Sequence, residues 1–148
     1  MTASDIETAD RLSRRRARML PVLAVIFLSQ QASYFADAWE GDRTVDHVKI
    51  AAWLVLSVVM LLALTTGGFW FKPRAVRALM DDEVTRAYRA DALKLGFIAT
   101  MIAGIALYFA SLFEPLGGRE AIHLLMTVGL AAALIRFGVL ERRALRDG

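Results

Sequence analysis

The stretch IAAWLVLSVVMLLALTTGGFWF, residues 50–71, contains 22 consecutive residues without a charge. A helix needs about 20 mainly apolar residues to cross roughly 30 Å of hydrocarbon, so this stretch alone is long enough to span a bilayer. Further uncharged runs occupy residues 19–36, 95–113 and 121–135. None of the four alternates like a barrel strand, and only helices or closed barrels satisfy backbone groups in lipid. We therefore predict an all-α integral membrane protein with four transmembrane helices in two hairpins.

The composition agrees with this fold class and excludes several kinds of chemistry. The chain has 148 residues, of which 57% are hydrophobic, and this is too apolar for an ordinary soluble domain of that length. It contains no cysteine, which excludes disulfides, thiolate catalysis and cysteine metal sites. The GxSxG, HExxH, P-loop and GxGxxG motifs are absent from the sequence. We expect a non-enzymatic protein without a cofactor.

The expected domain organisation follows the uncharged runs and the charges that flank them. A basic N-terminal segment at 1–18 precedes a transmembrane domain at 19–140, and a basic tail occupies 141–148. The helices are predicted at about 19–38, 48–71, 82–114 and 121–140, with a connector at 72–94.

The basic residues predict the orientation in the membrane. Fifteen of the 18 Lys and Arg residues precede the first run, lie between the second and third, or end the fourth. The other three are Arg43, Lys49 and Arg119. By the positive-inside rule, both termini and the connector face the cytoplasm of a bacterial inner membrane, and the third helix extends into the cytoplasm.

An alternative exists for the first helix. A basic segment followed by LPVLAVIFL, residues 20–28, and by ADA, residues 36–38, also resembles a secretory signal peptide. Cleavage there would leave three helices with termini on opposite sides of the membrane. We favour a retained first helix.

The connector and its junction with the third helix suggest a docking surface. Asp81 is a suitable N-cap, with Asp82 and Glu83 in the first helical turn, where negative charge complements the helix dipole. Residues 82–94 would then form a cytoplasmic stalk of roughly 20 Å. It is either a solvated extension or a surface for a cytoplasmic protein partner. The candidate docking residues are Arg77, Asp81, Asp82, Glu83, Arg86 and Arg89.

Arginines near both termini predict contact with anionic lipid, because each basic residue near such a surface contributes about 1 kcal/mol. Although RLSRRRAR at 11–18 is also compatible with nucleic acid, no direct nucleic-acid binding is expected. Arg136 interrupts the fourth run and is expected to extend to the membrane interface. The candidate lipid-binding residues are Arg14, Arg15, Arg16, Arg18, Arg142 and Arg143.

The outer half of the first helix has a polar face. Gln30, Ser33, Tyr34 and Asp37 follow helical spacing. They either bond to neighbouring helices or line a pocket open to the outside. The pocket would suit an alternative function, a small dimeric multidrug-type transporter.

Two other features leave alternatives open. Gly96, Thr100 and Gly104 form a face of small residues that favours close packing with the fourth helix, and a remaining small face would allow a homo-oligomer. His47 and His123 lie near the outer ends of their helices and are weak candidates for a metal or haem site. Metal or haem binding is thus a second alternative function.

The segment DDEVTRAYRADALKLGF, residues 81–97, resembles the acidic-x-x-Arg juxtamembrane segment of small, uncharacterised four-helix bacterial inner-membrane proteins. The resemblance covers about residues 70–140. Some of these proteins look like partners of small helix-turn-helix regulators. The resemblance implies the four-helix topology and a regulatory role, and it implies no catalytic residues.

Overall fold

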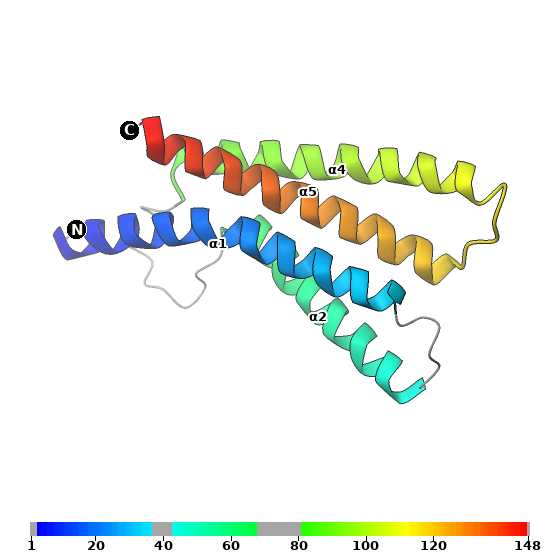
Figure 1. The fold of residues 1–148 in the computed structure, drawn as a ribbon. Coiled ribbons are helices and arrows are strands. Elements are labelled where there is room, and N and C mark those ends of the chain that lie inside the picture. The colour runs from blue at the N-terminus through cyan, green and yellow to red at the C-terminus, as the bar shows by residue number, and fades with distance from the viewer. Residues whose placement is uncertain (1–2, 37–42, 68–80, 148) are drawn as a thin grey trace.

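The computed structural model describes residues 3–36, 43–67 and 81–147, and these form an all-α structure of four helices. The helices are α1 (Ala3–Ala36), α2 (Arg43–Thr66), α4 (Glu83–Ala110) and α5 (Gly118–Asp147). Successive helices run in alternating directions, so both chain termini lie at the same end of the molecule (Figure 1). We call this the terminal end, and the end with the turn between α4 and α5 the opposite end.

The helix α5 is the centre of the arrangement. It packs most extensively against α4 and next against α1, whereas α2 makes fewer contacts with its neighbours. In Figure 1, α5 lies between α4 and α1. All four helices contribute to one hydrophobic core in the half of the bundle nearest the terminal end. Its buried members are Leu20, Ala24, Met60, Leu64, Ala92, Ala133, Leu134 and Phe137.

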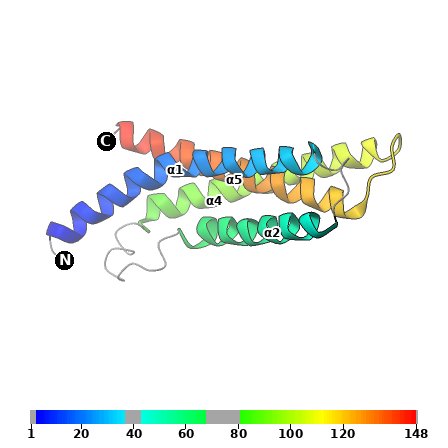
Figure 2. The ribbon, with the colours of Figure 1, turned by 60° about the horizontal axis from the view of Figure 1, so that its bottom comes forward.

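The N-terminal segment predicted at 1–18 is not separate from the first helix. Residues 3–36 form one helix, with Pro21 in its interior, and Figure 2 shows that its N-terminal part is inclined to the rest. Proline has no N–H to donate to the carbonyl four residues earlier. That carbonyl belongs to Ala17, and Arg142 Nε donates to it at 3.0 Å. An arginine of α5 thus replaces the hydrogen bond that Pro21 removes from α1.

Other predicted helix boundaries also need correction, since α2 begins at Arg43 and α5 at Gly118, both earlier than expected. The structure ends α2 at Thr66 and α4 at Ala110, and it extends α5 through the predicted tail to Asp147. The extension of α5 gives the first turns of α4 a packing partner, so these turns do not form a free stalk: Ala92 is fully buried. Residues 68–80, which include the first part (72–80) of the predicted connector, lie outside the described residues.

The N-cap of α4 is Asp82 rather than the predicted Asp81. Asp82 has an extended backbone conformation, and its Oδ1 accepts a hydrogen bond from the Thr85 N–H at 2.7 Å. This is the usual bond of an N-cap side chain to the third helical residue. The Asp81 carboxylate is instead paired with Arg89. The helix therefore starts one residue later than expected.

Close packing of α4 on α5 depends on glycine, as the small-residue face predicts. A Cβ atom added at Gly96 would lie 2.7 Å from the Gly129 carbonyl oxygen and 2.9 Å from Ala133 Cβ. The backbones of the two helices are thus too close to admit a methyl group at this position. Small residues at such a crossing let helices gain dispersion energy in lipid, where no hydrophobic force acts between them.

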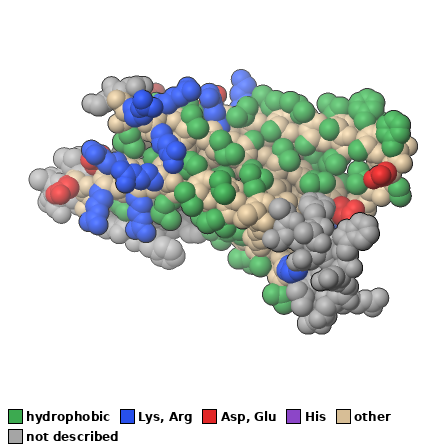
Figure 3. Space-filling model, viewed as in Figure 1, with side chains coloured by type: hydrophobic (Ala, Val, Ile, Leu, Met, Phe, Trp, Pro, Cys, Tyr) green, Lys and Arg blue, Asp and Glu red, His purple; other side chains and the backbone are tan. Residues whose placement is uncertain are grey.

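Three of the described helices are long and apolar enough to cross a membrane, namely Val48–Thr66, Glu83–Ala110 and Gly118–Arg146. Large apolar side chains are exposed along them, such as Val55 (65%), Phe97 (64%) and Ile122 (59%). In Figure 3, hydrophobic side chains cover much of the visible face, and Lys and Arg gather toward the terminal end. Extended apolar surfaces of this kind are rare on soluble monomers. The predicted crossing by the first helix stays a prediction.

We predict that Gly96→Ala lowers the free energy of unfolding by about 1–3 kcal/mol, because the added methyl group forces α4 away from α5. Unfolding in mixed detergent micelles, followed by circular dichroism, measures this change. Gly104→Ala is the matched control on the same helix, since its added Cβ would lie 3.6 Å from Leu125 Cδ2, an ordinary contact. Equal stability of the two variants would contradict close packing at Gly96.

Candidate functional site

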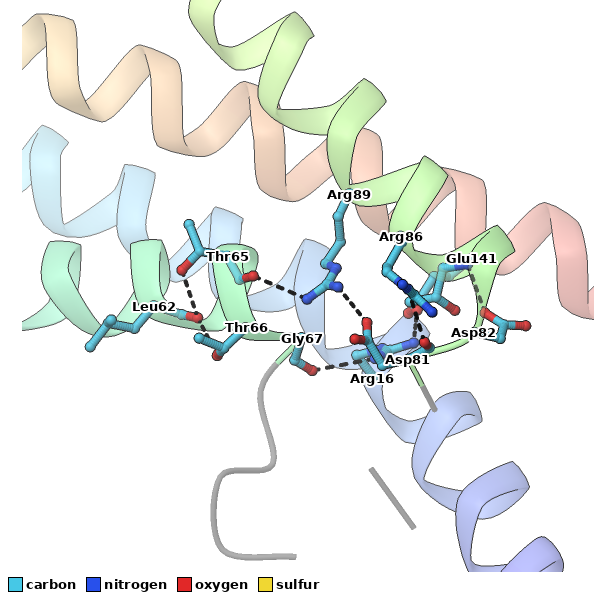
Figure 4. Close-up of polar contacts among 11 residues, drawn as sticks. Arg16, Leu62, Thr65, Thr66, Gly67, Asp81, Asp82, Arg86, Arg89 and Glu141 are labelled. Carbon is cyan, nitrogen blue, oxygen red and sulfur yellow. Dashed lines mark hydrogen bonds and ion pairs between the residues drawn. The ribbon is translucent and has the colours of Figure 1, made fainter. Parts of the chain in front are cut away.

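A group of polar contacts at the terminal end joins all four helices, and we call it the arginine network (Figure 4). It consists of the side chains of Arg16, Asp81, Arg89 and Glu141 with the backbone carbonyls of Thr65 and Gly67. Arg16 of α1 forms an ion pair with Glu141 of α5, and their side chains are only 8% and 7% exposed. The Arg16 guanidinium also lies 5.3 Å from the centre of the Phe137 ring, a cation–π distance.

The arginine network also binds the C-terminus of α2. Arg16 Nη1 donates to the Gly67 carbonyl at 3.3 Å, and Arg89 Nη1 donates to the Thr65 carbonyl at 3.1 Å. The last carbonyls of a helix lack partners within the helix and have partial negative charge, so two cations are favourable there. Gly67 has a φ of +77°, the left-handed conformation that glycine adopts just after a helix. A Cβ at this position would also lie 3.1 Å from Arg89 Nη1.

The third part of the arginine network lies at the start of α4. Arg89, which is 8% exposed, forms an ion pair with Asp81. The Asp81 carbonyl accepts a hydrogen bond from Arg86 Nε at 3.2 Å. Two arginines of α4 therefore hold Asp81, the residue just before the N-cap of this helix.

These contacts show where the candidate docking residues lie. Asp81 and Arg89 are paired with each other, with the Arg89 side chain 10% and the Asp81 side chain 43% exposed, and Asp82 caps its own helix. Glu83 and Arg86 are exposed. Arg77 lies outside the described residues.

The candidate lipid-binding arginines likewise include both exposed residues and residues that bond within the protein. Arg15, Arg18 and Arg143 are exposed, whereas Arg16 is buried in the arginine network. Arg14 is exposed and paired with Asp10 of the preceding turn at 2.9 Å. Arg142 is exposed overall, although its Nε donates to the Ala17 carbonyl.

Arg136, expected at the membrane interface, pairs with a carboxylate. Its guanidinium lies 2.7 Å from Asp91 of α4, and both side chains are partly exposed. The pair lies between the facing sides of α4 and α5 and adds to the packing of these helices toward the terminal end.

A second group of buried polar side chains lies farther from the terminal end, between α1, α2 and α5. Thr127 Oγ1 donates to Gln31 Oε1 at 3.3 Å. The rings of Trp53 and His123 are stacked, with their centres 3.8 Å apart and an angle of 18° between their planes. Three buried polar atoms here have no hydrogen-bond partner among the described residues: Gln31 Nε2, Trp53 Nε1 and Ser57 Oγ.

The predicted pocket residues do not coincide with this second group. Gln30 is half-buried, and the neighbouring Gln31 is the side chain that bonds to α5. The side chains of Ser33 and Tyr34 and all of Asp37 lie outside the described part of the chain. The transporter alternative and its pocket stay predictions.

His123, one of the weak metal candidates, is 3% exposed and stacks on Trp53 instead of facing a cluster of acids. The side chain of the other candidate, His47, is not described. Within the described ranges, no group of three His, Cys, Asp or Glu side chains lies close enough to hold a metal ion.

Sequence analysis missed Glu141, Gln31, Trp53, Ser57 and Thr127, although helical spacing contains a signal for each. For example, Glu141 follows the buried residues Leu134 and Phe137 at i+7 and i+4. Such a position predicts an inward-facing side chain. The sequence alone does not identify the helix against which this side chain packs.

No family model, curated protein or solved structure matches this chain.

Proposed function

We propose that this protein is a non-enzymatic interaction module of a bacterial inner membrane, with its terminal end in the cytoplasm and bound to anionic lipid headgroups. The chain would cross the bilayer four times, with α1 as the fourth crossing helix. The observation that supports the proposal is a set of exposed arginines on two helices at one end. They are Arg11, Arg15 and Arg18 of α1 and Arg143 and Arg146 of α5.

The spacing of these arginines favours a lipid surface. Arg11, Arg15 and Arg18 are related by i, i+4 and i+7 and share one face of α1. Since each basic side chain near an anionic bilayer contributes about 1 kcal/mol, even three of them give a substantial preference over a neutral surface. The inclination of the N-terminal part of α1 (Figure 2) is compatible with this part lying along the headgroups.

The internal pairing of the α4 residues is the reason to prefer lipid over a protein partner. Asp81, Asp82 and Arg89 are bonded within the protein, which leaves Glu83 and Arg86 exposed at the start of α4. A cytoplasmic partner, such as the regulator that the resemblance implies, would have to bind chiefly outside the arginine network.

The proposed orientation predicts the accessibility of single cysteines, which can be introduced without background because the chain contains none. Arg15→Cys and Arg143→Cys should resist a membrane-impermeant maleimide in spheroplasts, and Arg119→Cys should react. All three should react after permeabilisation. Labelling of Arg15→Cys or Arg143→Cys in intact spheroplasts would contradict the orientation.

The lipid proposal predicts that the protein binds phosphatidylglycerol more tightly than phosphatidylcholine. The variant Arg15→Gln/Arg18→Gln/Arg143→Gln should lose most of this preference, by at least about tenfold in relative affinity, because it removes three attractive charges. Native mass spectrometry with each lipid in neutral detergent measures both affinities.

Arg119→Gln is the control for the lipid experiment, because it removes an exposed arginine at the opposite end. It should leave the preference unchanged. If the triple variant keeps its preference, or if Arg119→Gln abolishes it equally, the terminal end is not the lipid-binding surface.

A further inference from the structure

A groove with apolar walls lies between α2, α4 and α5, where α2 and α4 make few contacts. Its volume is about 310 Å³, at the lower end of the range of small-molecule sites. Val58 and Leu61 of α2 and Leu93 and Phe97 of α4 are among the residues that line it. Val58 is 49% exposed and Phe97 is 64% exposed. The groove therefore opens to the surroundings of the bundle, which are hydrocarbon when these helices cross a membrane.

Toward the terminal end, the α4 wall of the groove continues as a stripe of residues that ends in two charges. The stripe consists of Glu83, Arg86, Ala90, Leu93 and Phe97. Successive members are three, four, three and four residues apart, so all five share one face of the helix. Glu83, Arg86 and Ala90 are exposed. From the terminal end inward, the stripe thus presents an acid, a base and then an apolar surface that leads into the groove.

The two charged side chains of the stripe are not paired with each other or with another charge among the described residues. Arg86 Nε donates to the Asp81 carbonyl at 3.2 Å, and this bond holds the guanidinium at the start of α4 (Figure 4). Its two Nη groups make no bond within the described ranges. The neighbouring Asp81 and Arg89, by contrast, are paired. Glu83 and Arg86 therefore keep their charges available to a ligand.

The spacing along the stripe matches the layers of one bilayer leaflet. At about 1.5 Å per residue, Arg86 lies roughly 10 Å and Glu83 roughly 15 Å beyond Leu93 along the helix axis. The headgroup layer on each side of the hydrocarbon core is about 5–8 Å thick. When the groove lies in hydrocarbon, Arg86 is therefore at the level of the lipid phosphates and Glu83 lies farther out. A ligand that follows the stripe has an apolar chain, then an anionic group, then a cationic group.

We propose that the stripe and the groove together bind one molecule of phosphatidylethanolamine. Arg86 donates to the phosphate, Glu83 accepts from the ammonium group, and one acyl chain lies in the groove between Leu61 and Phe97. The planar N–H donors of a guanidinium match the oxygens of a phosphate. A primary ammonium has three N–H donors for a carboxylate, whereas the quaternary ammonium of choline has none. The site differs from the exposed arginines of α1 and α5, which would attract anionic lipids.

The test compares phosphatidylethanolamine with phosphatidylcholine of identical acyl chains. Native mass spectrometry of the purified full chain in neutral detergent measures the affinity for the first bound molecule of each. The parent should bind phosphatidylethanolamine about twofold to fivefold more tightly, as expected for one exposed ion pair. Glu83→Gln should remove this preference and leave the affinity for phosphatidylcholine unchanged. Glu114→Gln is the matched control, because it neutralises an exposed acid at the opposite end, and it should keep the preference.

Two further pairs of variants test the phosphate contact and the position of the chain. Arg86→Gln should weaken both lipids about tenfold, because both have a phosphate, whereas Arg119→Gln at the opposite end should weaken neither. Val58→Phe fills the groove and should also weaken both lipids. Val55→Phe adds the same volume at an exposed position of α2 outside the groove walls and should leave binding unchanged. The charge variants alter exposed side chains, so the test does not depend on the folding of Val58→Phe.

Equal affinities of the parent for the two lipids, or a preference that survives Glu83→Gln, would overturn the proposal. A dimer that Val58→Phe dissociates, with neither lipid bound, would do so as well, because a second copy of the chain would then cover the groove.

The inference requires that α2, α4 and α5 cross a bilayer, but it does not require the terminal end to prefer anionic lipid. The variant Arg15→Gln/Arg18→Gln/Arg143→Gln should therefore keep the parent's ratio of phosphatidylethanolamine to phosphatidylcholine affinity, whatever happens to its preference for phosphatidylglycerol. Loss of that ratio in this variant would place the ethanolamine site at those arginines and contradict its assignment to α4.

Discussion

The ion pair between Arg16 and Glu141 places two opposite charges inside the bundle, where both side chains are more than nine-tenths buried. An isolated charge in such a place would be very costly, so each residue requires the other. Because Arg16 also bonds to the Gly67 carbonyl, the pair fixes α1, α2 and α5 at one level. Arg89 adds α4 through its bond to the Thr65 carbonyl. The arrangement of the four helices at the terminal end depends on this ion pair and on the bonds from the two arginines to the end of α2.

The same end of α5 compensates for the proline in α1. Arg142 bonds to the carbonyl that Pro21 leaves free, one residue along from the Arg16–Glu141 pair. A Cβ at Gly138 would lie 2.8 Å from ring atoms of Pro21, so glycine is needed there for the helices to approach. The inclination of α1 and the exposed face of arginines near its N-terminus therefore both depend on contacts with α5.

Much of the helical architecture could be predicted from uncharged runs, because hydrocarbon thickness sets the length of a crossing helix. The pairing of charges could not. Arg14, Arg15, Arg16 and Arg18 look equivalent in a basic segment, and Arg16 differs only because it lies four residues before the buried Leu20. The predicted first helix begins at about residue 19, so Arg16 is assigned to a separate segment and its helical relation to Leu20 is missed.

The same limit applies to the interior. Gln30 and Gln31 are adjacent and chemically identical, and only the rotation of α1 against α5 decides that Gln31 bonds to Thr127. Ser57 lies in a continuous apolar run that predicts a membrane helix whichever face it occupies. Its burial, at 1% exposed, depends on how α2 packs against the neighbouring helices, which is a property that no single helix encodes.

The direct test of the central claim is a double-mutant cycle on the buried ion pair, using Arg16→Met, Glu141→Met and the variant with both changes. Reversible unfolding in mixed micelles gives the free energy for each protein. Each single change should destabilise the fold by about 3–5 kcal/mol, because it leaves the other charge buried without a partner. The double variant should lose far less than the sum of the two. Additive losses, or single variants as stable as the parent, would show that this pair does not hold the helices together.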